Sequence, residues 1–238
     1  MPDLSTSAHT RQAILEAAAH EVLEHGYAGA SLSSIAGRLG LTKGALAYHF
    51  PTKDRIITAL LERFQSVLAE SDNAAAEVFG DSPSRACVAL VVNVGHAAGT
   101  DIVTTAAMSL FSDPSVSRDG LIGAMTDWVD RVLAHLQAMV AEEGYTFGVD
   151  LHDAAEFFIA TLGGTWMTAR YFPRTAARPR LQFTQLALEA IGLPPAVTDA
   201  VVADVLAAAR DQRVRIAPVE LMTGEPLQFR YGPPDAGS

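Results

Sequence analysis

The stretch SLSSIAGRLGLTKGALAYHF, residues 31–50, decides the fold. It predicts two short helices joined by a tight turn, because Ser31 and Thr42 are suited to capping a helix and Gly40 falls between the helices. A glycine can adopt the left-handed backbone conformation of such a turn at little cost. The apolar residues recur at spacings that pack both helices against a third, with the small Ala36 at the crossing: Leu32, Ile35, Leu39 and Leu46. The pattern is a helix-turn-helix, whose second helix enters the major groove of DNA with its N-terminal residues first.

Gly44 is unusual because it lies inside the second of these helices, where glycine costs about 1 kcal/mol relative to alanine. Near the start of a recognition helix, the missing side chain would let the backbone approach bases or phosphates. The alternative is an ordinary helical hairpin within a core. An exposed Lys43 between Thr42 and Gly44 fits that alternative poorly, so we interpret this helix as the DNA-reading element.

The composition limits which classes of protein this chain can belong to. The chain has 238 residues, of which 49% are hydrophobic and 18% charged, so it can bury a sizeable core. The net charge of −10 is unlike that of a nucleic-acid binder, but residues 1–63 carry as many basic as acidic side chains, and the excess of negative charge follows them. The single Cys87 cannot form an internal disulfide, and the N-terminus has no apolar signal segment. We therefore expect a cytoplasmic protein, and no membrane partner, because the uncharged run 86–100 is too short to span a bilayer.

The periodicity predicts an all-α fold, because apolar residues recur at helical spacing and no run shows sustained strand alternation. The expected helices after residue 52 are a long one through Leu68, then 85–111, 120–142, 153–172, 184–191 and 198–213, with a basic loop at 174–180. We expect three parts: a helix-turn-helix domain at 1–51, a ligand-binding and dimerisation domain at 52–213, and a Pro/Gly-rich tail at 214–238.

Residues 10–64 resemble the N-terminal domain of the TetR family of transcriptional regulators, above all in GLTKGALAYHFPTKD, residues 40–54. The resemblance implies contacts with double-stranded DNA, to bases or to the phosphate backbone. The implied contact residues are Ser31, Ser33, Thr42, Lys43, Gly44, Ala45, Tyr48, His49 and Lys53. Residues 42–45 would read base edges, and the others would lie near phosphates. The family usually has an aromatic residue where this chain has Ala47, so one contact with DNA is expected to be missing. Phe50 is expected to pack in the core.

The rest of the chain resembles the effector domain of the same family. In that domain the last two long helices form a four-helix bundle with a second copy, and Gly163-Gly164 would permit close helix approach there. A homodimer would place two recognition helices about one DNA turn apart, so that they read a palindrome. In the family, a small-molecule effector usually relieves repression.

Two segments resemble the subgroup of this family that senses γ-butyrolactone-type signalling molecules in actinomycetes: MTDWVDRVLAHLQAMVAEEG, residues 125–144, and AAEFFIATLGGTW, residues 154–166. The resemblance implies that Trp128 lines the effector pocket. Thr161, Thr165 and Trp166 share a helix face, and hydroxyls on such a face can orient a polar ring in an apolar pocket. They can equally bond to carbonyls of their own helix. Gln65 is a further polar candidate, and Trp128 can alternatively be a core aromatic.

Other classes of function fit less well. No glycine-rich phosphate loop follows a strand, and no histidine pair has metal-ligand spacing, so we expect no enzyme activity, no cofactor and no metal. A helical enzyme is the remote alternative. The closer alternative is a TetR-type regulator of efflux or lipid metabolism that senses a different effector.

Overall fold

The computed structural model describes residues 4–169 and 180–215. Within these ranges the fold is all-α, as predicted, and contains no strand. Each helix is bounded as follows: α1 Leu4–Gly29, α2 Leu32–Arg38, α3 Lys43–His49, α4 Lys53–Phe79, α5 Pro83–Thr100, α6 Ile102–Leu110, α7 Arg118–Glu142, α8 Leu151–Ala169, α10 Arg180–Ile191 and α11 Pro195–Arg210. Most of the predicted basic loop and of the predicted tail lies outside the described residues, and Arg180, expected in the loop, is instead the first residue of α10.

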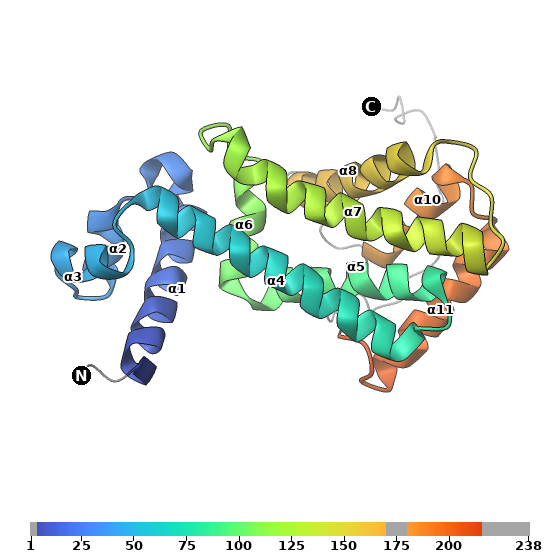
Figure 1. Cartoon of the computed structure of the whole chain (residues 1–238), viewed down its shortest axis with the longest axis horizontal. Coiled ribbons are helices and arrows are strands. Elements are labelled where there is room, and N and C mark those ends of the chain that lie inside the picture. The colour runs from blue at the N-terminus through green and yellow to red at the C-terminus, as the bar shows by residue number, and fades with distance from the viewer. Residues whose placement is uncertain (1–3, 170–179, 216–238) are drawn as a thin grey trace, which may run out of the picture.

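Helices α1, α2 and α3 form a small unit, called here the reading head, at one end of the molecule (Figure 1). The helix caps and the turn glycine are found where the sequence predicts them. The Ser31 side chain caps α2 in a reciprocal capping box with Ser34, and the Thr42 side chain caps α3. Gly40 has a φ of 65°, so the turn needs its glycine. Leu46 and Phe50 are buried in the core, and the helix-turn-helix prediction agrees with this geometry.

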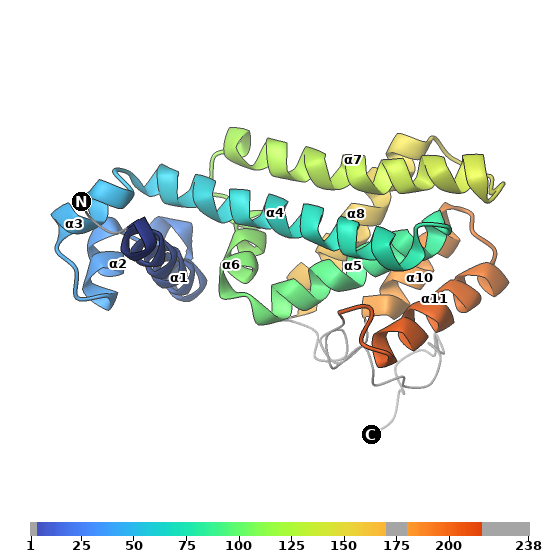
Figure 2. The same cartoon turned by 60° about the horizontal axis from the view of Figure 1, so that its bottom comes forward.

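The long helix α4 begins in the reading head and runs into the larger body of the molecule (Figures 1 and 2). In the body it packs against α5, α6 and α7, while α8 packs between α7 and α10, and α11 lies on α5 and α10. α6 also packs against α1, so the body is connected to the reading head through both α4 and α6. The division into parts at residues 51/52 and 213/214 stays a prediction.

The segment expected as one helix over 85–111 consists of two. α5 and α6 meet at a bend of 106°, and this expectation was therefore wrong. Asp101 ends α5 and caps α6, because its carboxylate accepts a hydrogen bond from the Val103 N–H. Among the described residues no single helix is long and apolar enough to cross a membrane, and α5 with α6 meets those criteria only across this bend.

Candidate DNA-binding surface and effector pocket

The N-terminal turn of α3 presents an open surface. Thr42, Lys43, Gly44 and Ala45 are all exposed, whereas Leu46 in the next turn is fully buried. Thr42 Oγ1 accepts a hydrogen bond of 3.1 Å from the Ala45 N–H, which fixes the start of the helix. The structure thus brings together the four residues expected to read base edges and leaves their outer sides free of the protein's own packing.

Neither packing nor backbone conformation within the chain requires a glycine at position 44. A Cβ placed there would meet no atom nearer than Thr42 Oγ1 at 4.0 Å, and the residue has an ordinary helical φ. An alanine would therefore fit and would favour the helix. The absence of a side chain leaves room for something outside the chain, which supports the interpretation of α3 as a recognition helix.

The residues expected near phosphates divide into two groups. Ser33 and Tyr48 are exposed, Tyr48 at 79%, and His49 is half-buried with its ring edge-on to Tyr48. Ser31 and Lys53 already have partners within the protein. The Ser31 hydroxyl accepts the Ser34 N–H at 3.0 Å. The Lys53 ammonium donates to the carbonyls of Tyr27 and Ala30 and lies 3.9 Å from the centre of the Tyr27 ring. A lysine has three N–H donors, so at most one remains for a phosphate.

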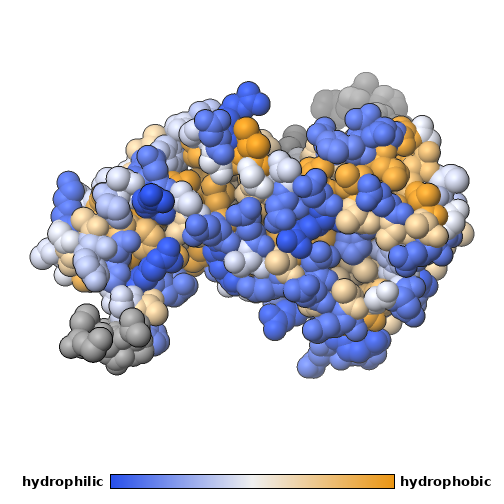
Figure 3. Space-filling model, in the orientation of Figure 1, coloured by the Kyte–Doolittle hydropathy of each residue, from blue (hydrophilic) through white to orange (hydrophobic). Residues whose placement is uncertain are grey.

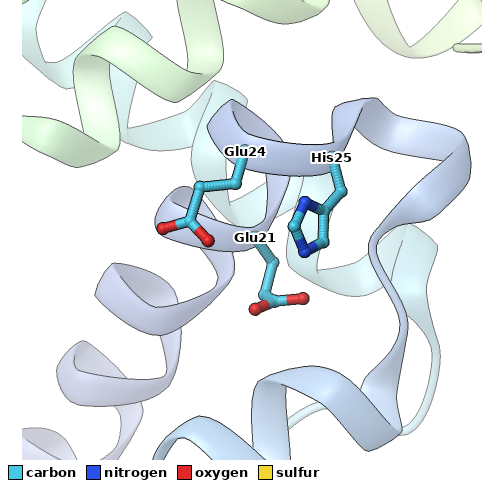
Figure 4. A group of neighbouring side chains, drawn as sticks. All are labelled: Glu21, Glu24 and His25. Carbon is cyan, nitrogen blue, oxygen red and sulfur yellow. The ribbon is translucent and has the colours of Figure 1, made fainter.

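A cluster of Glu21, Glu24 and His25 lies at the end of α1 (Figure 4). Their ligating atoms lie within 4.8 Å of one another, which is compatible with a metal ion. The Arg38 guanidinium already binds both carboxylates, at 2.8 Å from Glu21 and 2.6 Å from Glu24. The Ser34 hydroxyl and the Arg38 guanidinium hold the pKa of Glu21 below its ordinary value. We interpret the cluster as part of an ion-pair group that holds α1 against α2 through Arg38.

The body contains a cavity of about 450 Å³ between α6, α7 and α8. Its wall is mostly apolar, as ligand sites commonly are. A second cavity of about 30 Å³ adjoins it and shares three of its side chains, those of Met108, Trp128 and Trp166. The apolar part of the main wall includes Met108, Phe111, Met125, Trp128, Ile159 and Trp166.

The structure supports only part of the predicted pocket. Trp128 and Trp166 line the main cavity, and Thr165 lines the smaller one. The Thr165 hydroxyl donates to the Leu162 carbonyl of its own helix at 2.7 Å. Gln65 and Thr161 line neither of these two cavities.

Sequence reasoning missed the contribution of α6 altogether. Met108, Phe111 and Ser112 line the cavity, and the sequence has no pattern that links them with α7 and α8. Met125, Glu156 and Met167 were also missed. The one available signal is the concentration of methionines, which adapt readily to irregular apolar surfaces.

Trp128 has an unsatisfied polar group at the cavity. Its side chain is 4% exposed, and the buried indole Nε1 has no hydrogen-bond partner in the structure. A buried donor without a partner costs about 1–3 kcal/mol, and an acceptor in the cavity would regain that energy once a small shift of the indole exposes Nε1 to it. The Trp128 ring also packs edge-on against Phe64 of α4, with ring centres 5.4 Å apart. The indole therefore links the cavity to the helix that enters the reading head.

Together these features define a class: a helical protein that combines a helix-turn-helix reading head with an apolar ligand cavity. Residues 14–60 match the family described as bacterial regulatory proteins, tetR family. The chain is 36% identical over 72 residues to the HTH-type transcriptional repressor AcnR of Corynebacterium efficiens, a match that covers 29% of the chain and 38% of that relative. The resemblance to the TetR family is therefore confirmed, and it is carried by residues 14–60.

Two solved structures share the fold across most of the chain. A γ-butyrolactone receptor described as ArpA-like matches with a TM-score of 0.69 and 24% identity, over 92% of this chain and 100% of the receptor. SmeT, the repressor of the multidrug efflux pump SmeDEF of Stenotrophomonas maltophilia, matches with a TM-score of 0.62 and 24% identity, over 76% of this chain and 89% of SmeT. SmeT has also been solved in complex with triclosan. At these identities the likeness concerns the fold.

Proposed function

We propose that this chain is a ligand-responsive transcriptional repressor rather than an enzyme. One observation carries the proposal: α4 begins beside an exposed recognition helix and packs through Phe64 against Phe111 and Trp128, which line an apolar cavity. The reading head supplies DNA binding, and the cavity supplies a place where a small molecule can change it. The TetR-type domain at residues 14–60 supports this combination. Location in the cytoplasm follows as a prediction from this role.

We propose further that the chain acts as a homodimer. Two recognition helices are needed to read a palindromic operator. Figure 3 shows apolar side chains on the surface of the body, where a second copy could bury them. On α8, Phe157 and Met167 are 47% and 49% exposed, and large exposed apolar side chains on one element often mark an interface. The predicted bundle built from the last long helices is compatible with this position.

The effector we propose is a small, mainly apolar molecule with a hydrogen-bond acceptor, and a γ-butyrolactone-type molecule is one such compound. The apolar wall and the unpaired Trp128 N–H support this chemistry, and the ArpA-like receptor shares the fold. The second candidate is an effector of an efflux regulator, because SmeT shares the fold as well. Both candidates use the same mechanism on DNA and differ only in the molecule that fills the cavity.

A gel shift tests the proposal directly. Purified protein is mixed with DNA from upstream of its own gene, with and without an organic extract of the producing culture. A shift that the extract abolishes supports a ligand-released repressor. A shift that the extract leaves unchanged retains the DNA-binding role and favours the efflux or metabolic alternative. Without a shift, selection of bound fragments from the whole genome follows, and failure to select any sequence contradicts the proposal.

The recognition helix is tested by Lys43→Ala. We expect operator affinity to fall about 5- to 100-fold, the range for loss of a base or phosphate contact, with folding and dimerisation unchanged. Arg210→Ala is the matched control, because Arg210 is also an exposed cation but lies at the end of α11. Equal affinities of the Lys43 variant and the parent protein would remove this assignment of the recognition helix.

The pocket is tested by Trp128→Phe, which keeps an aromatic ring but removes the N–H together with part of the indole. We expect effector binding to weaken about tenfold while DNA binding without effector is preserved. Trp128→Ala is a less clean test, because loss of a buried tryptophan side chain costs about 3–5 kcal/mol of stability. The chain has two tryptophans, both at the cavity, so intrinsic fluorescence reports on this site directly. An unchanged effector dose-response in Trp128→Phe would contradict the role of the indole.

A further inference from the structure

The corner between α6 and α7 touches the reading head at one polar contact. Asp113 Oδ2 accepts a hydrogen bond of 2.8 Å from the backbone N–H of Tyr27, which lies 86 positions earlier in the chain. Asp113 directly follows Phe111 and Ser112, and both of these line the cavity. A displacement of the cavity wall at this corner would therefore carry the Asp113 carboxylate with it.

The geometry of α1 makes room for this contact. Gly26 interrupts the helix with φ 71° and ψ 172°, a conformation that other residues rarely adopt. A Cβ at Gly26 would lie 3.4 Å from Asp113 Oδ2, at the limit of ordinary contact. The break frees the Tyr27 N–H from the helix and turns it toward the carboxylate, so the last turn of α1 runs in a different direction from the rest of the helix.

Tyr27 is also tied to the beginning of α4. Its carbonyl accepts a hydrogen bond from the Lys53 ammonium, which also lies over its ring, and its hydroxyl lies 3.0 Å from Asp54 Oδ1. α4 begins shortly after α3 ends. Tyr27 thus binds the cavity corner through its N–H, and the start of α4 through its carbonyl and side chain.

Asp113 is held firmly on the body side. Its Oδ1 accepts hydrogen bonds from the N–H and the hydroxyl of Ser115. These bonds, with the Tyr27 N–H, hold the pKa of Asp113 below its ordinary value, so the carboxylate is ionised at neutral pH. The charged form is the stronger acceptor for the Tyr27 N–H.

We propose that the Asp113–Tyr27 contact transmits occupation of the cavity to the recognition helix, with Gly26 as the hinge. The inference rests on the proposed function, because it assigns how the cavity regulates the reading head. A molecule that presses on Phe111 and Ser112 moves the corner, and the hydrogen bond transfers this movement to Tyr27 and then to α4 beside α3. Coupling between two sites requires such a physical connection between them.

A competing route runs through aromatic side chains. Phe64 of α4 packs against both Trp128 and Phe111, with ring centres 5.4 Å apart in each pair. A ligand could act on α4 through Phe64 without involving Asp113. The two routes differ in one consequence: only the polar route is interrupted when Asp113 loses its carboxylate.

The test uses a side chain as a substitute for the unidentified effector. Gly163 and Gly164, expected from the sequence at the dimer bundle, line the cavity. A Cβ at Gly163 meets nothing within 4 Å, so Gly163→Leu fills part of the cavity in the full-length protein. Hydrogen exchange of the amides in α3 and the end of α1 is compared in a double-mutant cycle with Asp113→Ala. Ser115→Ala is the matched control, because it alters the same loop but leaves the Tyr27 contact in place.

We expect Gly163→Leu to change exchange in the reading head at least about fivefold in the parent and in Ser115→Ala, and less than about twofold in Asp113→Ala. An equal change in the parent and in Asp113→Ala would overturn the proposal in favour of the Phe64 route. No change in any background would overturn it as well. If a variant fails to fold, Ala160→Leu replaces Gly163→Leu as the cavity filler, and Asp113→Asn replaces Asp113→Ala.

This readout is independent of DNA. If neither the gel shift nor the selection from the genome finds a bound sequence but the cycle shows coupling, the proposed function fails and the transmission contact stands. If operator release by the extract persists unchanged in Asp113→Ala, the proposed function stands and the transmission contact fails.

Discussion

At the scale of single residues, two exposed helical glycines allow the effect of a substitution on stability to be distinguished from its effect on DNA binding. Gly44 on α3 and Gly37 on α2 are both exposed, and a Cβ at either position would meet no atom closer than 4.0 Å. Only Gly44 lies on the surface that we assign to DNA. The pair therefore offers matched substitutions with the same effect on the helix and different effects on binding.

We predict that Gly44→Ala and Gly37→Ala each stabilise the protein by about 0.5–1 kcal/mol, because alanine favours a helix over glycine. Only Gly44→Ala should weaken operator binding, since its methyl group occupies the space left for bases or phosphates. Urea unfolding and gel shifts of the two variants check this. Equal operator affinities of the two variants would show that α3 does not need a glycine for close approach.

Lys53 shows how a residue can serve the fold rather than the partner expected from a motif. Its ammonium binds the Tyr27 and Ala30 carbonyls at the end of α1. We predict that Lys53→Met destabilises the protein by about 1–3 kcal/mol, because it leaves these carbonyls without their charged donor. Thermal unfolding measures this, with Lys43→Ala as the control that should leave stability unchanged. A loss of DNA affinity with unaltered stability would instead support the phosphate contact.

At the scale of helices, the α5–α6 corner depends on Asp101. Its carboxylate binds the Val103 N–H at 3.0 Å, the Thr104 hydroxyl at 2.7 Å and Arg63 Nε at 3.1 Å. These bonds hold the pKa of Asp101 below its ordinary value, although burial opposes the shift. The corner sets the direction of α6, which packs against α1 and lines the cavity near its other end, so its position matters for both sites.

We predict that Asp101→Ala lowers the free energy of unfolding by about 1–2 kcal/mol, because it removes the helix cap and the partner of Arg63. Asp101→Asn should lose roughly half as much, since asparagine also caps helices but does not pair with the guanidinium. Urea unfolding of both variants measures this order. A smaller loss for alanine than for asparagine would mean that the cap does not stabilise the corner.

At the scale of the whole molecule, α4 is held to α7 by a partly buried ionic group. Asp72 on α4 lies 3.0 Å from Arg131 and 2.8 Å from His135 Nε2, both on α7. The hydrogen bond with His135 is the main reason why the pKa of Asp72 lies below its ordinary value, and Arg131 adds to the shift. Because α4 also enters the reading head, this group holds the far half of the same helix in the body.

We predict that this group makes stability depend on pH in acid. A carboxyl whose pKa is lowered by folding stabilises the folded state above its unfolded pKa of about 4, and that contribution is lost as pH falls through the lower folded value. Asp72→Asn should cost about 1–2 kcal/mol at pH 7, and the cost should shrink as the pH is lowered through the folded pKa. Urea unfolding over a series of acidic pH values checks this. Asp204→Asn, which alters the half-exposed pair with Arg85, should cost about 0–1 kcal/mol and serves as the control.

The features that could be read from the sequence are those set by neighbours along the chain. Ser31, Gly40 and Thr42 mark the ends of the two short helices, because a cap or a turn depends on residues three or four positions apart. The all-α class follows from helical periodicity for the same reason. The exposed first turn of α3 was also expected, since Lys43 and Gly44 are residues that a buried helical hairpin would not place there.

The cavity, the bend at Asp101 and the partners of Lys53 and Asp113 depend on segments that meet only in the folded chain. The cavity wall takes residues from α6, α7 and α8, and periodicity within one helix does not show which other helix it faces. Asp113 reaches Tyr27 across 86 positions, and Asp101 is fixed by Arg63 from α4. Packing brings these groups together because each buries polar or apolar surface that its own segment cannot cover. Local signals therefore set the helices and their ends, and contacts between distant helices set the pocket and its connection to the reading head.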